Sequence, residues 1–148
     1  MKKMISVVVV LGAVLAAGAP AHARDTKLMM PIAAALNANN AKERLGDSVQ
    51  FYFGTQKTPS ILNKIARDQT SQKTNSFGKT PETSCNWVFL SAMLSLQKRA
   101  VELGANAVVN IVSNYQNVEN SSETEFECHD GAIMSGVALK GDFVKLAP

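Results

Sequence analysis

The chain has 148 residues, of which 46% are hydrophobic and 18% are charged, so it is long enough for one domain with a single core. Its 15 basic and 12 acidic residues give a formal net charge of +3, and no segment gathers the basic residues into a cluster. Nucleic-acid binding depends on several Lys or Arg contacts to phosphate, so this pattern argues against nucleic acid as the main partner.

The first residues have the pattern of a secretory signal peptide. Two lysines follow Met1, an apolar run extends from Met4 to about Ala17, and Ala21-His22-Ala23 provides a small-residue cleavage site. A membrane anchor is the alternative, but a span needs about 20 apolar residues. This run is shorter, and Gly18 and Pro20 interrupt its end. We expect cleavage after Ala23 and a periplasmic location.

Removal of residues 1–23 leaves 125 residues, 24–148, which we expect to fold as a single domain. Lys2 and Lys3 leave with the signal peptide, so 13 basic residues remain against 12 acidic ones. No cysteine lies near the cleavage site, so the lipidated cysteine of a bacterial lipoprotein is not expected. The mature protein should therefore have no stable membrane anchor.

The beginning of the mature chain predicts two short helical segments and a strand. Apolar spacing between Lys27 and Leu45 predicts a helix that begins near Pro31, a break at Asn37–Asn40, and a second helical turn. Apolar and polar residues alternate in Ser48–Phe53, which predicts a strand that ends at Gly54.

Residues 55–83 are rich in Gln, Lys, Thr, Ser and Asn and have the least ordered pattern of the mature chain. One apolar patch, Ser60–Ala66, has helical spacing. A long polar connection in a compact domain is either functional or mobile. The segment leads into Pro81–Ser84, which offers N-cap residues for the next element.

The segment from about Ser84 to Leu103 predicts one long amphipathic helix. Its apolar residues fall on two adjoining sides, which together are wide enough to pack on a sheet. One side has Trp87, Leu90, Leu94 and Val101, and the other has Phe89, Met93, Leu96, Ala100 and Leu103. Gly104 stands where a left-handed C-cap is expected.

A strand at Ala107–Ser113 follows the helix closely, and Asn106 is expected to bond the tight connection. Alternation would place three residues on the core face and Asn110 on the opposite face. The three core-facing residues would be Ala107, Val109 and Ile111.

Three further strands are expected at Glu123–Cys128, Ile133–Leu139 and Phe143–Leu146, with Gly131 and Gly141 as boundaries. The predicted fold class is therefore α+β. One long amphipathic helix would pack on a small mixed or antiparallel sheet of about four to five strands.

Cys85 and Cys128 are the two cysteines of the chain, and both lie in the part that we expect to be exported. Two cysteines in a small exported domain typically form one structural disulfide. A redox-active pair is the alternative, but the Cys-X-X-Cys spacing that lowers thiol pKa values is absent. We therefore predict a disulfide between Cys85 and Cys128.

Candidate metal ligands are concentrated after residue 122. His129 and Asp130 could contribute to a site, although a surface turn is the simpler interpretation, and a site needs three or four converging ligands. Glu123, Glu125 and Glu127 share a strand face and could bind a hard cation, but a solvated face that resists edge pairing explains them as well. We assign no metal or cofactor, and His129, Asp130, Glu125 and Glu127 remain candidate ligands.

No catalytic constellation is visible in the sequence. The mature chain has one histidine, and nothing marks an activated serine. Gly78-Lys79-Thr80 resembles the end of a phosphate-binding loop, but Lys73 stands where that motif needs its first glycine, and Pro81 follows directly. We expect no enzymatic activity and reject nucleotide hydrolysis.

Two blocks of sequence carry a family resemblance. Ala100–Val109, with Gly104-Ala105-Asn106-Ala107 at its centre, resembles a helix-to-strand signature. The YbjQ-type family of proposed heavy-metal-binding proteins shares this signature with the Rcs envelope-stress sensor lipoprotein. The segment Thr124–Asp142 is similar to a group of small exported proteobacterial proteins of unknown function, often named as excinuclease ATPase subunits. The chain does not support that name, because it has neither a phosphate loop nor zinc-type cysteine pairs.

The resemblance implies a compact α+β domain with one long helix on a small sheet. It also implies a disulfide from the helix start to a later strand, because Cys85 and Cys128 occupy places that match the sensor. The chain departs from the sensor in lacking its lipidated cysteine and its second disulfide.

Together these features predict a non-enzymatic periplasmic binding or envelope stress-related domain. The expected partner is an envelope protein or component, not nucleic acid. The alternative is a metal- or small-ligand-binding protein, which the YbjQ-type resemblance implies to be a homo-oligomer.

Overall fold

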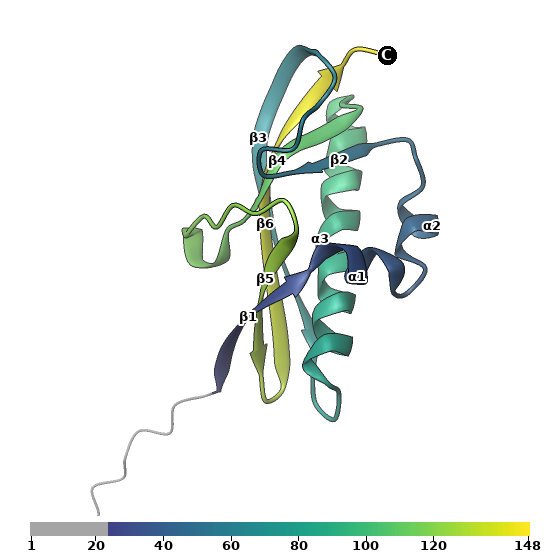
Figure 1. The fold of residues 1–148 in the computed structure, drawn as a ribbon. Coiled ribbons are helices and arrows are strands. Elements are labelled where there is room, and N and C mark those ends of the chain that lie inside the picture. Colours follow the sequence, from purple (N-terminus) through teal and green to yellow (C-terminus); the bar gives the residue numbers. More distant parts are fainter. Residues whose placement is uncertain (1–23) are drawn as a thin grey trace, which may run out of the picture.

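The computed structural model of the chain describes residues 24–148, so the expected signal peptide lies outside the described residues. Figure 1 shows a long helix lying along one face of a twisted sheet. The elements are β1 (Asp25–Pro31), α1 (Ile32–Asn37), α2 (Ala41–Leu45), β2 (Gln50–Phe53), β3 (Ile61–Asn75), α3 (Pro81–Leu103), β4 (Ala107–Ser113), η1 (Tyr115–Asn117), β5 (Glu125–Gly131) and β6 (Met134–Leu146). None of the helices in this part of the chain combines the length and apolar character that a membrane span needs.

The six strands form one mixed sheet, so the expected number of four to five was too low. Its central strand is β6, which pairs antiparallel with β3 along one edge and with β5 and β4 along the other. Beyond these, β1 pairs antiparallel with β5, and β2 pairs parallel with β4. The expected mixture of helix and sheet is confirmed.

The polar segment after β2 forms most of an unexpected strand. The predicted helical patch at Ser60–Ala66 is wrong, because Ile61–Asn75 is a 15-residue strand paired with β6 along its length. From Ala66 onward its residues alternate between half-buried and exposed, which is the period of a strand. The half-buried side is itself polar: Thr70 Oγ1 donates to Ser95 Oγ of α3 at 2.9 Å. Hydrophobicity therefore gave no sign of this strand.

Gly141 lies inside β6 and is not the boundary that we expected. A Cβ at this position would lie 2.7 Å from Val108 Cγ1 and 3.2 Å from Ile111 Cγ1. Glycine is required here because side chains of the neighbouring strand β4 lie over the backbone of β6, not because the chain turns.

Helix α3 begins at Pro81, three residues before the predicted start, and has 23 residues. Thr80 caps it by accepting a hydrogen bond from the Thr83 N–H at 3.2 Å, and proline is well suited to the first helical position. Trp87 and Val101, both placed on the apolar stripe, are 39% and 63% exposed. In contrast, the polar residues Ser84 and Asn86 are buried. The predicted amphipathic stripe therefore describes only part of the helix.

The main core lies between α3 and the sheet face that α3 covers, here called the inner face. Phe89 of α3 stacks on Phe126 of β5 with 4.2 Å between ring centroids. Cys85 of α3 forms a disulfide with Cys128 of β5, and neither residue has exposed surface. The predicted disulfide is confirmed, and it joins the beginning of the helix to the sheet.

The Gly104–Ala107 signature connects α3 to β4. Gly104 has φ of 71° and ends the helix as a left-handed C-cap, as expected. Asn106 closes the connection through its side chain: Oδ1 accepts from the Leu146 N–H at 2.7 Å, and Nδ2 donates to the Leu146 carbonyl at 3.2 Å. These contacts give Asn106 a structural role that fixes the end of β6.

Strand β4 contains an irregularity that changes which residues face the core. Its register with β6 shifts between Val109 and Val112, and Asn110 has φ of 49°. Val108 and Ile111 belong to the main core, whereas Ala107 and Val109 pack with two β6 residues in a second cluster. The expectation that Ala107, Val109 and Ile111 share one face was wrong, because a bulge interrupts the alternation.

Candidate functional site

The face of the sheet opposite α3, here called the outer face, carries the candidate site. Figure 1 shows the loop after β4, which contains η1, projecting on this side of the sheet. Its base is fixed where Asn114 N–H donates to the Ala138 carbonyl at 2.9 Å and where Ser113 pairs with Asn120. Gln116 and Asn117 have φ of 51° and 63°, in the left-handed region that few residues other than glycine adopt. The loop thus fixes Tyr115 in place.

The Tyr115 ring stacks on the ring of His129, with 3.4 Å between the ring centroids and 8° between the planes. This aromatic contact joins the loop after β4 to strand β5. It also covers one side of the imidazole, whose side chain is only 13% exposed. His129 is therefore part of a packed arrangement and not the surface turn that we expected.

Both ring nitrogens of His129 face carboxylates. Nδ1 lies 2.8 Å from Asp25 Oδ1, and Nε2 lies 2.6 Å from Glu127 Oε1. A neutral imidazole has one N–H donor, whereas the protonated ring has two. His129 thus contacts a carboxylate through each nitrogen and connects β5 to the start of β1.

Glu127 is buried, which contradicts the expectation of a solvated glutamate face on this strand. Burial raises the pKa of its carboxyl, whereas hydrogen bonds with His129 and Asn120 lower it. The lowering effects are larger together, so the net shift of the pKa is downward. Lys27 Nζ, 3.6 Å from Oε2, adds a positive charge. Glu127 is thus held as a carboxylate by its neighbours.

We predict that Glu127 contributes to the acid sensitivity of folding. A carboxyl whose pKa is lower in the folded chain stabilises the fold above its unfolded pKa, and that contribution is lost as the pH falls through the folded pKa. The stability of the native protein should therefore decrease as the pH falls below 4.5, the ordinary pKa of glutamate. In Glu127→Gln this decrease should be shallower, and stability at neutral pH should be about 1–2 kcal/mol lower.

Urea unfolding across a pH series measures both effects. Glu125→Gln is the matched control, because it removes the same charge from an exposed position on the same strand. If the free energy of unfolding changed with pH in the same way for native protein and Glu127→Gln, the Glu127–His129 contact would not stabilise the fold.

A polar cleft of about 530 Å³ lies between the loop and β3 on the outer face. Most of its lining side chains carry amides or hydroxyls, and we call it the amide cleft. The lining residues are Gln69, Thr70, Ser71, Lys73, Asn114, Tyr115, Gln116, Asn117 and Ala138. Asn114 Nδ2 donates to Gln69 Oε1 at 2.5 Å, which joins the two walls. The lining contains one cation and no carboxylate, histidine or thiol.

A second cleft of about 190 Å³ lies beside the amide cleft, and Lys73 and Tyr115 line both. Arg24 and Asp25 from the start of β1, together with His129, contribute to the lining of this smaller cleft. The pKa of Tyr115 is raised by burial and by the negative charges of Asp25 and Glu127. The phenol thus stays protonated well above neutral pH.

The structure separates the predicted metal ligands. His129 and Glu127 are adjacent on the outer face, Glu125 is exposed, and Asp130 is buried on the side of α3. Within residues 24–148, no three His, Cys, Asp or Glu side chains are grouped so that they could hold a metal ion. The geometry of the described residues therefore does not support a metal site built from these four residues.

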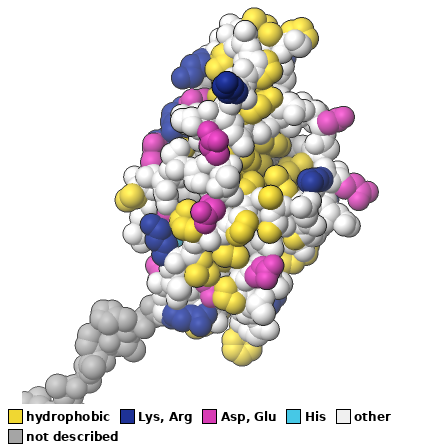
Figure 2. Space-filling view, viewed as in Figure 1, with side chains coloured by type: hydrophobic (Ala, Val, Ile, Leu, Met, Phe, Trp, Pro, Cys, Tyr) yellow, Lys and Arg dark blue, Asp and Glu magenta, His cyan; other side chains and the backbone are white. Residues whose placement is uncertain are grey.

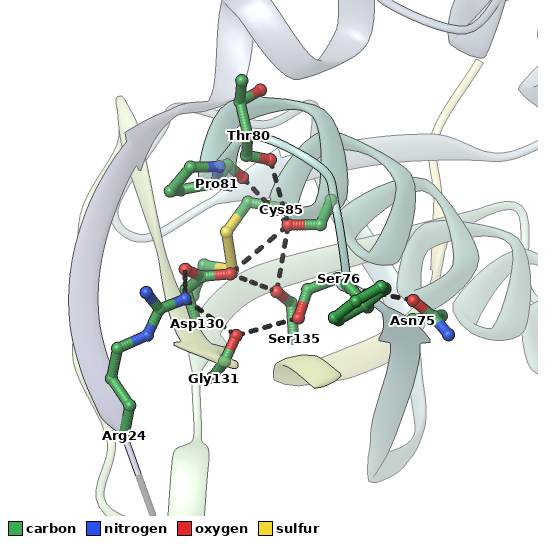
Figure 3. A network of polar contacts seen from close by, with 12 residues as sticks. Arg24, Asn75, Ser76, Thr80, Pro81, Cys85, Asp130, Gly131 and Ser135 are labelled. Carbon is green, nitrogen blue, oxygen red and sulfur yellow. Dashed lines mark hydrogen bonds and ion pairs between the residues drawn. A yellow bond between two sulfur atoms is a disulfide. The ribbon is translucent and has the colours of Figure 1, made fainter. Parts of the chain in front are cut away.

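Asp130 belongs to a buried polar network beside the disulfide (Figure 3). Its Oδ1 accepts a hydrogen bond from Ser135 Oγ at 2.6 Å, and Ser84 Oγ lies 3.4 Å from the same oxygen. Arg24 lies 3.1 Å from Oδ2 and also donates to the Gly131 carbonyl at 3.0 Å. The network joins β1, the β5–β6 turn and the beginning of α3, which is a structural role.

Gly78-Lys79-Thr80 also has a structural role. Thr80 caps α3, and Lys79 Nζ donates to the Asn75 carbonyl at 3.0 Å within the same turn. The resemblance to a phosphate-binding loop is limited to these three residues.

The sequence interpretation missed the residues that form the clefts, above all Gln69, Lys73 and Tyr115. The only local sign was Asn114-Tyr115-Gln116-Asn117, a polar run that is typical of a turn.

No protein-family model matches the chain, and no curated protein matches it either. The resemblance to exported and stress-sensor proteins therefore remains an expectation.

Proposed function

We propose that the protein is a non-enzymatic periplasmic binding domain that recognises an envelope protein or component through the amide cleft. The observation that carries this proposal is the lining of the cleft. Amide and hydroxyl side chains both donate and accept hydrogen bonds, so they suit a partner with uncharged polar groups. The expected role in envelope stress or envelope maintenance is part of the same proposal.

The chemistry of the lining supports binding rather than catalysis. General acid–base catalysis needs a group that changes protonation near neutral pH, and nucleophilic catalysis needs an activated nucleophile. None of the cleft's lining side chains is a carboxylate, an imidazole or a thiol. His129 stands next to the cleft, but both its nitrogens are engaged by carboxylates.

The disulfide supports the proposed compartment. Such bonds persist in oxidising environments, of which the bacterial periplasm is one. Cys85 and Cys128 are fully buried in the core, so the disulfide is part of the packed interior.

Site-specific crosslinking in living cells tests the proposal. A photoreactive amino acid at exposed Gln116, on the rim of the amide cleft, should capture a defined envelope partner, whereas the same group at exposed Gln56 should not. Ser71→Ala/Lys73→Ala should lower the yield at Gln116 by about fivefold or more, since it removes two polar side chains of the cleft.

The matched control is Lys57→Ala/Ser60→Ala, which removes one lysine and one serine from exposed positions outside the cleft. Equal yields from the two double variants would contradict the proposed role of the amide cleft.

A further inference from the structure

Two turns meet at the end of the molecule where the chain enters the domain. The turn between β3 and α3 is bonded to the hairpin between β5 and β6: Ser76 N–H donates to the Ile133 carbonyl at 2.7 Å, and Ser76 Oγ donates to the Gly131 carbonyl at 2.9 Å. These bonds hold the two turns side by side and keep their side chains together.

Three large apolar side chains project from these turns, and we call them the apolar tip. Phe77, Ile133 and Met134 are 74%, 64% and 44% exposed. Phe77 N–H donates to Asn75 Oδ1 at 2.8 Å, and Gly78 adopts φ of 70°, so the turn itself keeps Phe77 out of the core. Single exposed apolar residues are common, whereas three on two joined turns make this end of the molecule a candidate interaction surface.

Basic side chains surround the apolar tip. Lys79 follows Phe77 by two residues and is exposed, and Arg24 and Lys73 line the smaller cleft together with Met134. Of the nearby acidic groups, Asp25 contacts His129 and buried Asp130 contacts Arg24, whereas Glu82 in the first turn of α3 is exposed. Figure 2 shows hydrophobic side chains at this lower end of the molecule, with both basic and acidic ones beside them.

The chain enters the domain at the same end. β1 begins at Asp25, and Arg24 donates to the Gly131 carbonyl in the β5–β6 turn at 3.0 Å. Residues 1–23, which the sequence predicts to be an export signal, directly precede this end of the domain in the chain. The apolar tip therefore lies at the end of the domain where the described chain begins.

We infer that the apolar tip docks on a bilayer that contains anionic phospholipid. Phe77, Ile133 and Met134 enter the boundary between headgroups and acyl chains, while Arg24, Lys73 and Lys79 lie next to lipid phosphates. Shallow apolar insertion combined with a few basic residues gives reversible membrane association, which depends on lipid charge and on salt. Apart from Lys73, the residues of this surface do not line the amide cleft that we propose to bind the partner.

Vesicle sedimentation tests the inference with the protein as cells export it, its N-terminus identified by mass spectrometry. Native protein should pellet with vesicles of phosphatidylglycerol and phosphatidylethanolamine, less at high salt, and not with vesicles of phosphatidylcholine alone. Phe77→Ser/Ile133→Ser/Met134→Ser should reduce the bound fraction by about tenfold or more. Lys79→Glu should reduce it to a smaller extent.

The matched triple control is Leu62→Ser/Val101→Ser/Val118→Ser, which removes three apolar side chains that are also well exposed but lie outside the tip. Lys57→Glu is the control for charge. Both controls should bind as native protein does, and thermal unfolding should show that every variant is folded. Failure of native protein to pellet with anionic vesicles, or equal binding by the tip and control variants, would overturn the inference.

Discussion

Loss of the Cys85–Cys128 disulfide should lower the free energy of unfolding by about 4 kcal/mol. The bond closes a loop across a sequence separation of 43, and the expected loss is the loop-closure entropy that the unfolded chain regains. Small domains have total stabilities of roughly 5–15 kcal/mol, so the reduced protein should lose roughly a quarter to four-fifths of its stability.

Urea unfolding with and without reductant measures this effect, and thiol labelling confirms that both cysteines are free in the reduced sample. Cys85→Ala/Cys128→Ala should unfold at a similarly low denaturant concentration, and reductant should not change its unfolding. Because both cysteines are fully buried, this variant also loses core packing, so the comparison within native protein is the cleaner one. An unchanged midpoint after complete reduction would contradict the prediction.

The elements that could be predicted from the sequence are those with apolar periodicity or a cap. α3 has buried residues at helical spacing and ends at Gly104, and β2 lies within the alternating segment Ser48–Phe53. β1 was missed because only Leu28 and Met30 of its seven residues are half-buried, too few to reveal a strand. β3 was missed because the side that faces α3 is largely polar, as the Thr70–Ser95 hydrogen bond shows.

The candidate site could not be predicted, because long-range pairing assembles it. Pairing of β1 with β5 brings Asp25 to His129, and the loop after β4 brings Tyr115 over the same ring. The burial of Glu127 depends on Asn120, Lys27 and His129, two of which lie on other segments. No short motif records such contacts, so the sequence suggested ligands where the structure has an internal ion-pair cluster.

Asp130→Ala should lower the free energy of unfolding by about 3 kcal/mol, although the sequence interpretation considered Asp130 as a metal ligand. The side chain is 3% exposed, and its removal leaves the hydroxyls of Ser84 and Ser135 without their carboxylate acceptor. It also releases Arg24, which connects the start of β1 to the β5–β6 turn. Hydrogen bonds to a charged group contribute about 1.5–3 kcal/mol each. The loss should not be larger, because Ser84 keeps the Thr80 carbonyl as an acceptor and Ser135 keeps Ser84 Oγ.

A double-mutant cycle separates a coupled network from independent contacts. Ser135→Ala alone should be destabilising, and Asp130→Ala/Ser135→Ala should cost at least about 0.5 kcal/mol less than the sum of the single variants. Asp130→Asn should cost less than Asp130→Ala, since it keeps an oxygen that can accept from Ser135 while losing the charge that attracts Arg24. If the two single effects simply add, the Asp130–Ser135 contact is not a coupling element.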